Sequence, residues 1–347
     1  MPLRPTIADL AQKAGVSVAT VDRVLNGRHP VRVETAQLVY EAAQAIGFRA
    51  TTLIRRRIEA DEKPEVTLGL ILQRPDQAFY QHFKVEAERA AAKALGARIR
   101  LVIDFLPAQD PTETAQRLTA MRGRAAAIAM TSIDHHRVTE AVLDLKSHGV
   151  PVVALLSDFA QGVRHGYIGL DNLRAGRTAA CQIAQTIRPT DDRPQVAVLV
   201  GGHRWHGHEL REAGFRSYFR EHAPWVEVLD TLVTLEAPEL SHETVLTLLA
   251  RRGRLAGIYS AGGGMEGAIR ALREEAPGRR IAVVVNELTD ESRPALADGL
   301  LSLVIETPLR HLCESLMTRL IRAGLGQSNE GPTDMFLPMA LHLPESL

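Results

Sequence analysis

From residue 65 onward, short apolar runs alternate with amphipathic stretches, and this repeat constrains the fold more than any other feature of the sequence. The runs have the length and β-branched content of buried strands, and the stretches between them repeat apolar residues at helical spacing. Strands are expected at 66–72, 99–105, 125–131, 150–156, 167–171, 195–201, 226–233, 255–261, 281–286 and 300–306. Helices are expected at 82–95, 112–121, 137–148, 173–187, 207–222, 242–252, 265–275 and 309–321. Such alternation predicts parallel βαβ units.

The length of this region indicates two sheets rather than one. The chain has 347 residues, which suits two or three domains, and the part after residue 64 is long enough for two doubly wound sheets facing a cleft. Ligands in such folds bind beyond the carboxyl ends of the strands. The predicted fold class for this region is therefore α/β, with two doubly wound, Rossmann-like subdomains.

The first 48 residues have a different pattern and predict an all-α head of three short helices. Thr6 is a candidate cap for the first helix, Gly15 ends it, and Ser17 can cap a second helix that reaches Leu25. A third helix is expected at about 34–46. In the second helix Val21, Val24 and Leu25 are predicted to face inward, and Val18, Ala19, Asp22 and Arg23 outward. Two such short helices joined by a glycine turn form a helix-turn-helix.

The charge is divided unevenly along the chain. Residues 1–58 hold nine Lys and Arg against four Asp and Glu, 9 − 4 = +5, and since the whole chain is neutral the rest carries −5. A small basic head gains affinity for a polyanion by displacing counterions from its phosphates. The charge distribution therefore points to a polyanion as the partner of the head.

The remaining composition limits the setting. No apolar run approaches the roughly 20 residues of a membrane span, and the opening residues lack the apolar core of a signal peptide. The cysteines, Cys181 and Cys313, form no close pair. We therefore expect a protein of the reducing cytoplasm without a membrane partner.

These residues resemble a known family. The segment Thr6–Phe48, TIADLAQKAGVSVATVDRVLNGRHPVRVETAQLVYEAAQAIGF, is similar to the DNA-binding head of the lactose-repressor (LacI/GalR) family of bacterial transcription regulators. Residues 65–347 resemble its effector domain, which has the type I periplasmic-binding-protein fold. The resemblance implies a helix-turn-helix domain at 1–48, a hinge at 49–64 and an effector-binding and dimerisation domain at 65–347. Its N-subdomain takes about 65–166 with 304–331, and its C-subdomain takes about 167–303 with 332–347.

The resemblance also implies a function. The chain is expected to be a sequence-specific DNA-binding regulator, a repressor, that works as a homodimer. A small sugar, polyol or sugar derivative bound between the subdomains is expected to control its affinity for the operator. Neither an enzymatic activity, nor a cofactor, nor a metal site is expected.

The predicted DNA contacts are concentrated in the head. Arg23 is the expected base reader, because an outward Arg in the major groove can bind guanine O6 and N7 together. By resemblance, the set of DNA-contacting residues is Thr6, Ser17, Val18, Ala19, Asp22, Arg23, Asn26, Thr35 and Arg57. Two of them depart from the family. Asp22 replaces a serine near phosphate and has to turn away or be neutralised, and Arg57 stands where the family wedges a leucine into the minor groove.

The predicted effector contacts follow strand ends or match family motifs. Arg211, in the RxxGF motif, resembles the Arg that grips the ligand, and Phe79 and Tyr80 resemble an aromatic pair that packs on a sugar ring. The full set is Phe79, Tyr80, Ser157, Asp158, Asp171, Asn172, Arg211 and Glu287. The segment 260–267 and Thr307 depart from the family pattern, so the identity of the ligand stays open.

Two other functions remain as alternatives. Gly262, Gly264 and Gly267 form a GxGxxG pattern between a strand and a helix, with Glu287 twenty residues further on, as in NAD-linked oxidoreductases. The same glycines could instead let backbone N–H groups bind an anionic ligand. A transport binding protein would use the same cleft but would need an export signal. The histidines at 203, 206 and 208 are expected in a loop and lack metal-ligand spacing.

Overall fold

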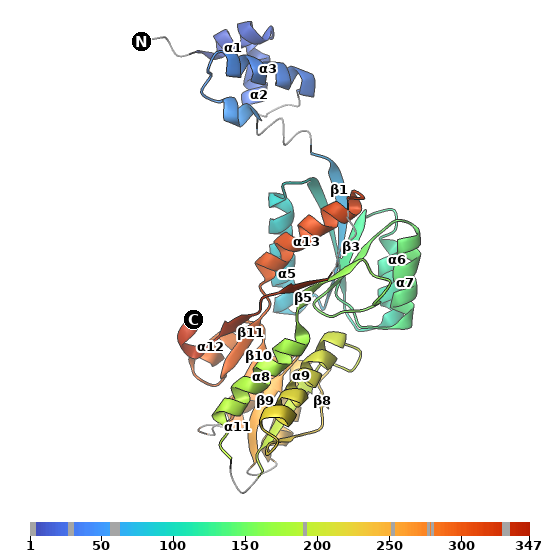
Figure 1. Cartoon of the computed structure of the whole chain (residues 1–347), viewed down its shortest axis with the longest axis vertical. Coiled ribbons are helices and arrows are strands. Elements are labelled where there is room, and N and C mark those ends of the chain that lie inside the picture. The colour runs from blue at the N-terminus through green and yellow to red at the C-terminus, as the bar shows by residue number, and fades with distance from the viewer. Residues whose placement is uncertain are drawn as a thin grey trace. The chain divides into compact units, whose positions relative to one another are not determined.

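The computed structural model describes residues 5–26, 31–55, 63–189, 193–250, 254–275, 278, 281–327 and 334–347. The chain forms two structural units (Figure 1). The head unit holds the residues up to Glu65 together with Leu95–Arg98, and the body holds Val66–Ala94 and Ile99–Leu347. Among the described residues, no helix is both long and apolar enough to span a bilayer.

The head contains the three predicted helices, which are α1 (Ile7–Ala14), α2 (Val18–Asn26) and α3 (Val33–Ala45). Helix α1 begins at a reciprocal cap in which the Asp9 backbone N–H donates to Thr6 Oγ1 and the Thr6 N–H donates to Asp9 Oδ2. It ends at Gly15, whose φ of 66° lies in the left-handed region that glycine adopts without a steric cost. The helix-turn-helix expected from the sequence is confirmed.

A small apolar core holds the head together. Its buried side chains come from all three helices and from the segment after them: Leu10, Ala11, Val21, Val24, Ala36, Val39, Ala42, Ala43, Phe48 and Ile54. Residues 51–55 are helical, and Ile54 has no exposed surface. The core therefore continues beyond residue 48, where the boundary of the head was predicted.

The first lobe of the body is a parallel sheet covered by helices on both faces. Its elements are β1 (Glu65–Gln73), α5 (Ala78–Lys93), β2 (Arg98–Leu106), α6 (Pro111–Ala120), β3 (Ala127–Met130), α7 (His136–Ser147), β4 (Val152–Leu155), β5 (Gly166–Leu170), α13 (Leu309–Gly324) and β12 (Met335–Leu337). The strand order is β12-β5-β4-β3-β1-β2. Helices α5 and α13, far apart in sequence, pack together on one face, and α6 and α7 pack on the other (Figure 1). Two covered faces explain why β3, β4 and β5 are buried along their whole length, whereas the edge strand β2 carries charged residues.

The second lobe repeats this plan. Its elements are α8 (Asn172–Thr186), β6 (Gln195–Val200), α9 (His206–His222), β7 (Glu227–Val228), β8 (Leu232–Val233), α10 (Pro238–Ala250), β9 (Leu255–Ser260), α11 (Met265–Glu275), β10 (Ala282–Asn286), α12 (Ser292–Ala297), β11 (Leu303–Glu306), β13 (Ala340–His342) and the 3-10 helix η1 (Pro344–Ser346). The strand order is β13-β11-β10-β9-β6-β7, with β8 also paired to β6. The pairs β6–β9, β9–β10 and β10–β11 are parallel, and β13 joins β11 antiparallel. Both lobes confirm the predicted doubly wound α/β architecture.

The chain crosses between the two sheets three times. It leaves the first sheet after β5, returns after β11, and crosses again between β12 and β13. These positions differ from the predicted subdomain limits, because β5 pairs with β4 in the first sheet, β11 lies in the second, and β12 lies in the first. The single strand expected at 226–233 is two short strands, and α12, β12 and β13 were not predicted.

Candidate functional site

A cleft lies where the carboxyl ends of the strands in the two lobes face each other. It encloses about 770 Å³, open solvent at its mouth included. Its walls are the segments that follow β1, β3 and β4 in the first lobe and β9, β10 and β11 in the second, together with the start of α9. The lining residues are Gln77, Ala78, Phe79, Tyr80, Thr131, Leu156, Ser157, Trp205, Gly207, His208, Arg211, Glu236, Gly262, Gly263, Gly264, Met265, Glu266, Asn286, Glu287, Thr289 and Thr307.

Arg211 lies in the cleft wall with its guanidinium held by two acceptors. Its Nε donates to Asn172 Oδ1 at 2.8 Å, and one terminal nitrogen donates to the Ala261 carbonyl at 2.7 Å. The side chain is almost fully buried. Helix α9 supplies Arg211 and helix α8 supplies Asn172, so the close packing of these two helices fixes the position of the charge.

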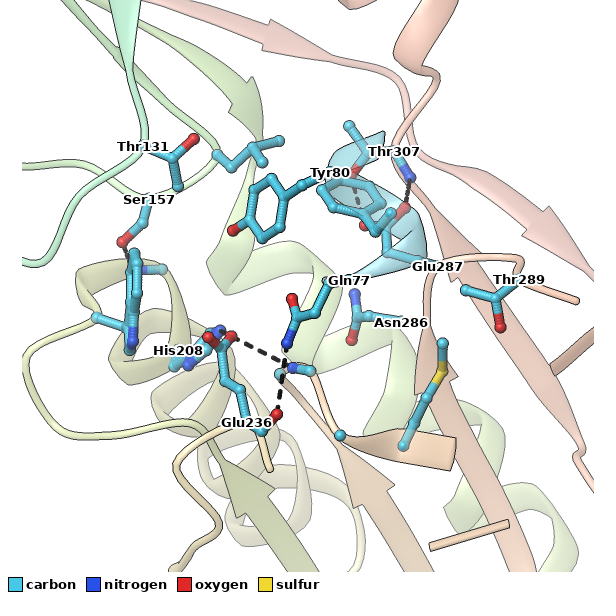
Figure 2. A pocket seen from close by; sticks show the side chains of 18 of the residues that line it. Gln77, Tyr80, Thr131, Ser157, His208, Glu236, Asn286, Glu287, Thr289 and Thr307 are labelled. Carbon is cyan, nitrogen blue, oxygen red and sulfur yellow. Dashed lines mark hydrogen bonds and ion pairs between the residues drawn. The ribbon is translucent and has the colours of Figure 1, made fainter. Parts of the chain in front are cut away.

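Glu287 follows β10 and forms the opposite side of the cleft, where Figure 2 shows it beside Thr307. Its carboxylate accepts from Thr307 Oγ1 at 2.7 Å and from the Thr307 backbone N–H at 3.0 Å. Burial raises the pKa of Glu287 to about 7, because desolvation disfavours the charged form more than these hydrogen bonds favour it. This carboxyl group therefore titrates near neutral pH.

Glu236 is a second buried carboxylate in the cleft, and its contacts are long. Its Oε1 accepts from the Gly263 N–H at 3.3 Å, and its Oε2 accepts from Gln109 at 3.4 Å. His208 Nε2 lies 3.7 Å from Oε1, while His208 Nδ1 accepts from the Gly201 N–H. Burial, and secondarily the charge of Arg211, lowers the pKa of His208 to about 3, so this ring is neutral. Burial raises the pKa of Glu236.

Apolar rings and unpaired polar atoms complete the cleft. Phe79 and Tyr80 meet edge to face at 5.1 Å between ring centroids, and the Trp205 ring is buried. Within the described part of the chain, Thr131 Oγ1 and Trp205 Nε1 of the lining are buried without a hydrogen-bond partner, and the buried Asn286 amide has the Tyr259 hydroxyl as its neighbour. Buried polar groups are normally paired, so these atoms mark positions where a polar ligand fits.

The two lobes touch across the mouth of the cleft. Arg74 donates from a terminal nitrogen to the Leu235 carbonyl at 2.6 Å, and Gln77 Nε2 donates to the Glu236 carbonyl at 3.4 Å (Figure 2). Arg74, Leu235 and Glu236 all have φ between 36° and 55°, a left-handed conformation that is costly for residues other than glycine. The contact between the lobes is therefore formed by strained backbone.

The cleft gathers five of the eight predicted effector residues, Phe79, Tyr80, Ser157, Arg211 and Glu287. The other three lie elsewhere. Asp158 pairs with Arg164, which also binds Asp334, and Asp171 caps α8 by accepting from the Arg174 N–H. Asn172 is buried behind the cleft, where it accepts from Arg211 and donates to Leu156 O and Tyr167 OH.

Sequence reasoning missed several lining residues. His208, within the predicted helix 207–222 but not among the predicted effector contacts, lies in the first turn of α9, near Glu236. Glu236 follows a two-residue strand, and its fully buried carboxylate has no sequence signal at all. Trp205 lies just before the helix predicted at 207–222, and Asn286 ends the strand predicted at 281–286. These positions were the available sequence signal for the two residues.

The GxGxxG segment adopts the strand-turn-helix context that its pattern predicts, but its glycines serve packing. A Cβ at Gly267 would lie 1.7 Å from the Pro238 carbonyl, so this glycine lets α11 approach α10. A Cβ at Gly262 would meet the His208 ring at 2.7 Å. The Gly263 N–H is occupied by Glu236.

The outward face of α2 carries the predicted base readers. Val18, Ala19, Arg23 and Asn26 are exposed, and Ser17 caps the helix by accepting from the Thr20 N–H. Thr6, also exposed, caps α1, and Thr35 is half-buried in the first turn of α3.

Asp22, which replaces the family serine, is engaged by its own helix. Asn26 Nδ2 donates to Asp22 Oδ1 at 2.5 Å. The carboxylate is thus held by an uncharged neighbour on its own helix. Arg57 lies outside the described residues. Of the apolar residues that precede it in the sequence, Leu53 is exposed and Ile54 packs into the head core.

Comparison with known families agrees with both units. Residues 6–50 match the family model described as bacterial regulatory proteins, lacI family. Residues 68–310, more than two thirds of the chain, match the model described as periplasmic binding protein domain.

Curated relatives cover most of the chain. The chain is 22% identical to the HTH-type transcriptional regulator GalS of Salmonella typhimurium (strain LT2) over 272 residues, covering 78% of this chain and 75% of GalS. It is 23% identical to the HTH-type transcriptional regulator AscG of Escherichia coli (strain K12), covering 91% of each chain.

Solved structures share the fold of the body. One is an ABC transporter solute-binding protein from Agrobacterium vitis bound with α-D-tagatopyranose, with a TM-score of 0.71 and 22% identity over 81% of this chain and 95% of that one. Another solute-binding protein from the same organism, with bound D-fucose, has a TM-score of 0.72 and 16% identity over 80% and 96%. The chain belongs to the periplasmic binding protein domain family over most of its length and, with the lacI-type head before that domain, it is a LacI-family helix-turn-helix transcriptional regulator.

Proposed function

We propose that this regulator is a repressor whose α2 helix reads an operator and whose cleft binds a small sugar-like effector that sets the affinity for that operator. The observation that carries the proposal is the presence, in one chain, of a lacI-type head and a cleft with unpaired buried polar atoms. The sugars named in the titles of two structures with the same fold support this class of ligand.

The proposed DNA contacts are the nine residues predicted from the sequence, with Arg23 as the base reader. Support comes from the exposure of Val18, Ala19 and Arg23 on one face of α2. A single short helix supplies few base contacts, so we expect two heads of a homodimer to read two half-sites of a pseudo-palindrome. Binding to bacterial operators implies a cytoplasmic protein.

The proposed effector contacts combine predicted and newly found residues. Arg211 and Glu287 supply ionisable groups of opposite sign. Phe79 and Tyr80 form an aromatic wall, and Ser157 follows a strand end. We add Trp205, His208, Glu236 and Asn286, whose polar atoms face the same space.

We propose binding rather than catalysis in this cleft. Its named relatives are regulators, and the GxGxxG glycines have steric roles in helix packing. An oxidoreductase would bind NAD(H) and turn over a polyol, so titration with NAD(H), followed by absorbance in the presence of polyols, separates the two functions.

The DNA side of the proposal is tested with Arg23→Ala. A cognate duplex is first selected from a random pool with the full-length protein, and its affinity is then compared with that of scrambled DNA. We expect the variant to lose about 1 to 3 kcal/mol on the cognate duplex and much less on scrambled DNA, because a bidentate base contact carries sequence information whereas phosphate contacts do not. Equal losses on both duplexes would remove Arg23 from base reading, and failure to select any duplex would refute the proposed function.

A further inference from the structure

We propose that the cleft selects an uncharged or cationic polyol, such as a sugar or an amino sugar, and rejects sugar acids and sugar phosphates. The inference deepens the proposed function, on which it rests, because it names the ligand class of the same cleft. Four observations carry it: the charges of the lining, the contacts of its cation, the state of its glycine loop, and the polar atoms left unpaired.

Acidic groups outnumber cations among the described residues that line the cleft. Glu236, Glu266 and Glu287 carry carboxyl groups, whereas Arg211 is the cation of the lining, since His208 is neutral; Arg74, at the contact between the lobes, also acts on Glu236. Desolvation raises the pKa of all three carboxyl groups. In their ionised form these groups repel an anionic ligand, while a hydroxyl or ammonium donor relieves the cost of their burial.

Arg211 is poorly available for gripping an anion. A guanidinium binds a carboxylate or phosphate most strongly through two parallel N–H groups. Here Nε already donates to Asn172 and a terminal nitrogen to the Ala261 carbonyl, both within 2.8 Å. The N–H groups on the Nε side of the guanidinium therefore cannot both bind an anion, because Nε already donates to Asn172. Arg211 can still donate single hydrogen bonds to ligand hydroxyls.

The glycine loop after β9 is closed to anions by the protein itself. Backbone N–H groups of such loops commonly bind phosphate at the start of a helix. In this chain the Gly263 N–H donates to Glu236 Oε1, so a carboxylate of the protein occupies the position (Figure 2). An incoming anion would have to displace Glu236, a buried residue that also contacts Gln109.

The unpaired atoms of the lining match hydroxyl groups. Trp205 Nε1 requires an acceptor, Thr131 Oγ1 can donate or accept, and the Asn286 amide offers a donor and an acceptor side by side. A hydroxyl group can both donate and accept, and thus satisfies each of these partners. An acidic or phosphate group only accepts, so it adds no donor to those that Glu236 and Glu287 already receive from the protein.

The experiment measures thermal shift of the full chain with matched sets built on one scaffold each. For glucose, the set is D-glucose, D-glucosamine, D-glucuronate and D-glucose 6-phosphate, and galactose and ribose sets follow the same plan. We expect that, in any set that stabilises the protein, the neutral sugar or the amine binds at least about tenfold more tightly than the acid and the phosphate, about 1.4 kcal/mol. Tighter binding of an acid or phosphate overturns the inference while leaving the proposed function standing. No stabilisation by any set counts against both.

Glu236→Gln tests the assigned cause, with Glu239→Gln as the matched control on the exposed start of α10. We expect the Glu236 variant to lose most of the discrimination against the acid, because the amide keeps the size of the side chain but removes its charge. The Glu239 variant should discriminate as the wild type does. Unchanged discrimination in both Glu236→Gln and Glu287→Gln would overturn the electrostatic explanation. Since affinities for two ligands of one variant are compared, a general loss of stability does not mimic the result.

Discussion

At the scale of single residues, Glu287 combines a strained backbone with a buried charge. Its φ of 71° lies in the left-handed region, which costs a non-glycine residue on the order of 1 to 3 kcal/mol. Its side chain is partly buried and its carboxylate receives both donors of Thr307. A residue held in this way is fixed in direction, so its oxygens point to one place in the cleft.

The raised pKa of Glu287 predicts a specific dependence of stability on pH. The carboxyl group has a pKa of about 7 when folded and 4.5 as its ordinary value, so between these values the folded protein binds a proton that the unfolded chain does not. Stability from this group is full below pH 4.5 and is lost as the pH rises through 7. The shift corresponds to on the order of 3 kcal/mol at about 1.36 kcal/mol per pH unit.

The melting temperature of Glu287→Gln should therefore rise relative to that of the wild type as the pH increases from 5 to 8. The measurement is the difference in melting temperature between the two proteins at each pH, in which the contributions of the other titrating groups cancel. A difference in melting temperature that stays constant from pH 5 to pH 8 would show that Glu287 ionises at its ordinary pKa.

Sequence reasoning pointed to Arg211 and Glu287 through a motif and a strand end, and both line the cleft. Asp158 and Asp171 also follow strands but do not line it, because a carboxylate there can equally pair with a nearby Arg or cap a helix, as these two do. The position of Glu236 in the cleft could not be predicted from the sequence, because its burial arises from long-range contacts and from no local pattern.

At the scale of elements, the contact between α8 and α9 positions the cation of the cleft. Two glycines face the partner helix reciprocally. A Cβ at Gly176 of α8 would lie 1.9 Å from the Arg211 carbonyl, and a Cβ at Gly214 of α9 would lie 2.1 Å from the Leu173 carbonyl. The backbones therefore approach more closely than any other residue type allows, which brings Asn172 within reach of Arg211.

Gly214→Ala is expected to separate these helices. Overpacking of this kind costs about 1 to 3 kcal/mol, although alanine by itself favours a helix by about 1 kcal/mol over glycine. The control is Ala213→Gly at the adjacent exposed position, which changes helix propensity alone. Melting temperature and effector affinity should both fall in Gly214→Ala, and an increase in stability would contradict the close approach of the two helices.

The element pattern could be predicted where strands are long and buried and failed where they are short. The run at 226–233 was taken as one strand, but residues 229–231 belong to no strand and divide it into β7 and β8, each of two residues. β12 and β13 have three residues each, which is too short for a periodic signal. Their pairing with β5 and β11 depends on long-range contacts between distant parts of the chain.

At the scale of the whole molecule, the function requires that the state of the cleft change the affinity of the head for DNA. Such coupling between two sites is typically worth about 1 to 3 kcal/mol. Contacts such as Arg74 with Leu235 stabilise the closed lobes, and a ligand shifts the balance only by binding one state more tightly than the other.

Arg211→Ala should uncouple effector from operator. Operator affinity without effector is expected to stay within about twofold, because Arg211 belongs to the body, while the response to an effector that acts on the wild type is lost with its hydrogen bonds. Arg220→Ala, on the exposed end of α9, is the control. Operator titrations with and without effector provide the measurement, and a wild-type response from Arg211→Ala would place the effector elsewhere.

The three crossings between the sheets limit how the lobes can move. They follow β5, β11 and β12, and two of these strands, β5 and β12, are paired neighbours. With three short connections, twisting one lobe against the other stretches at least one segment, so rotation about the line of the crossings remains the available motion. The size of a bound ligand then sets the angle between the two lobes. Two polyols of equal affinity but unequal size should therefore act on transcription as inducer and antagonist.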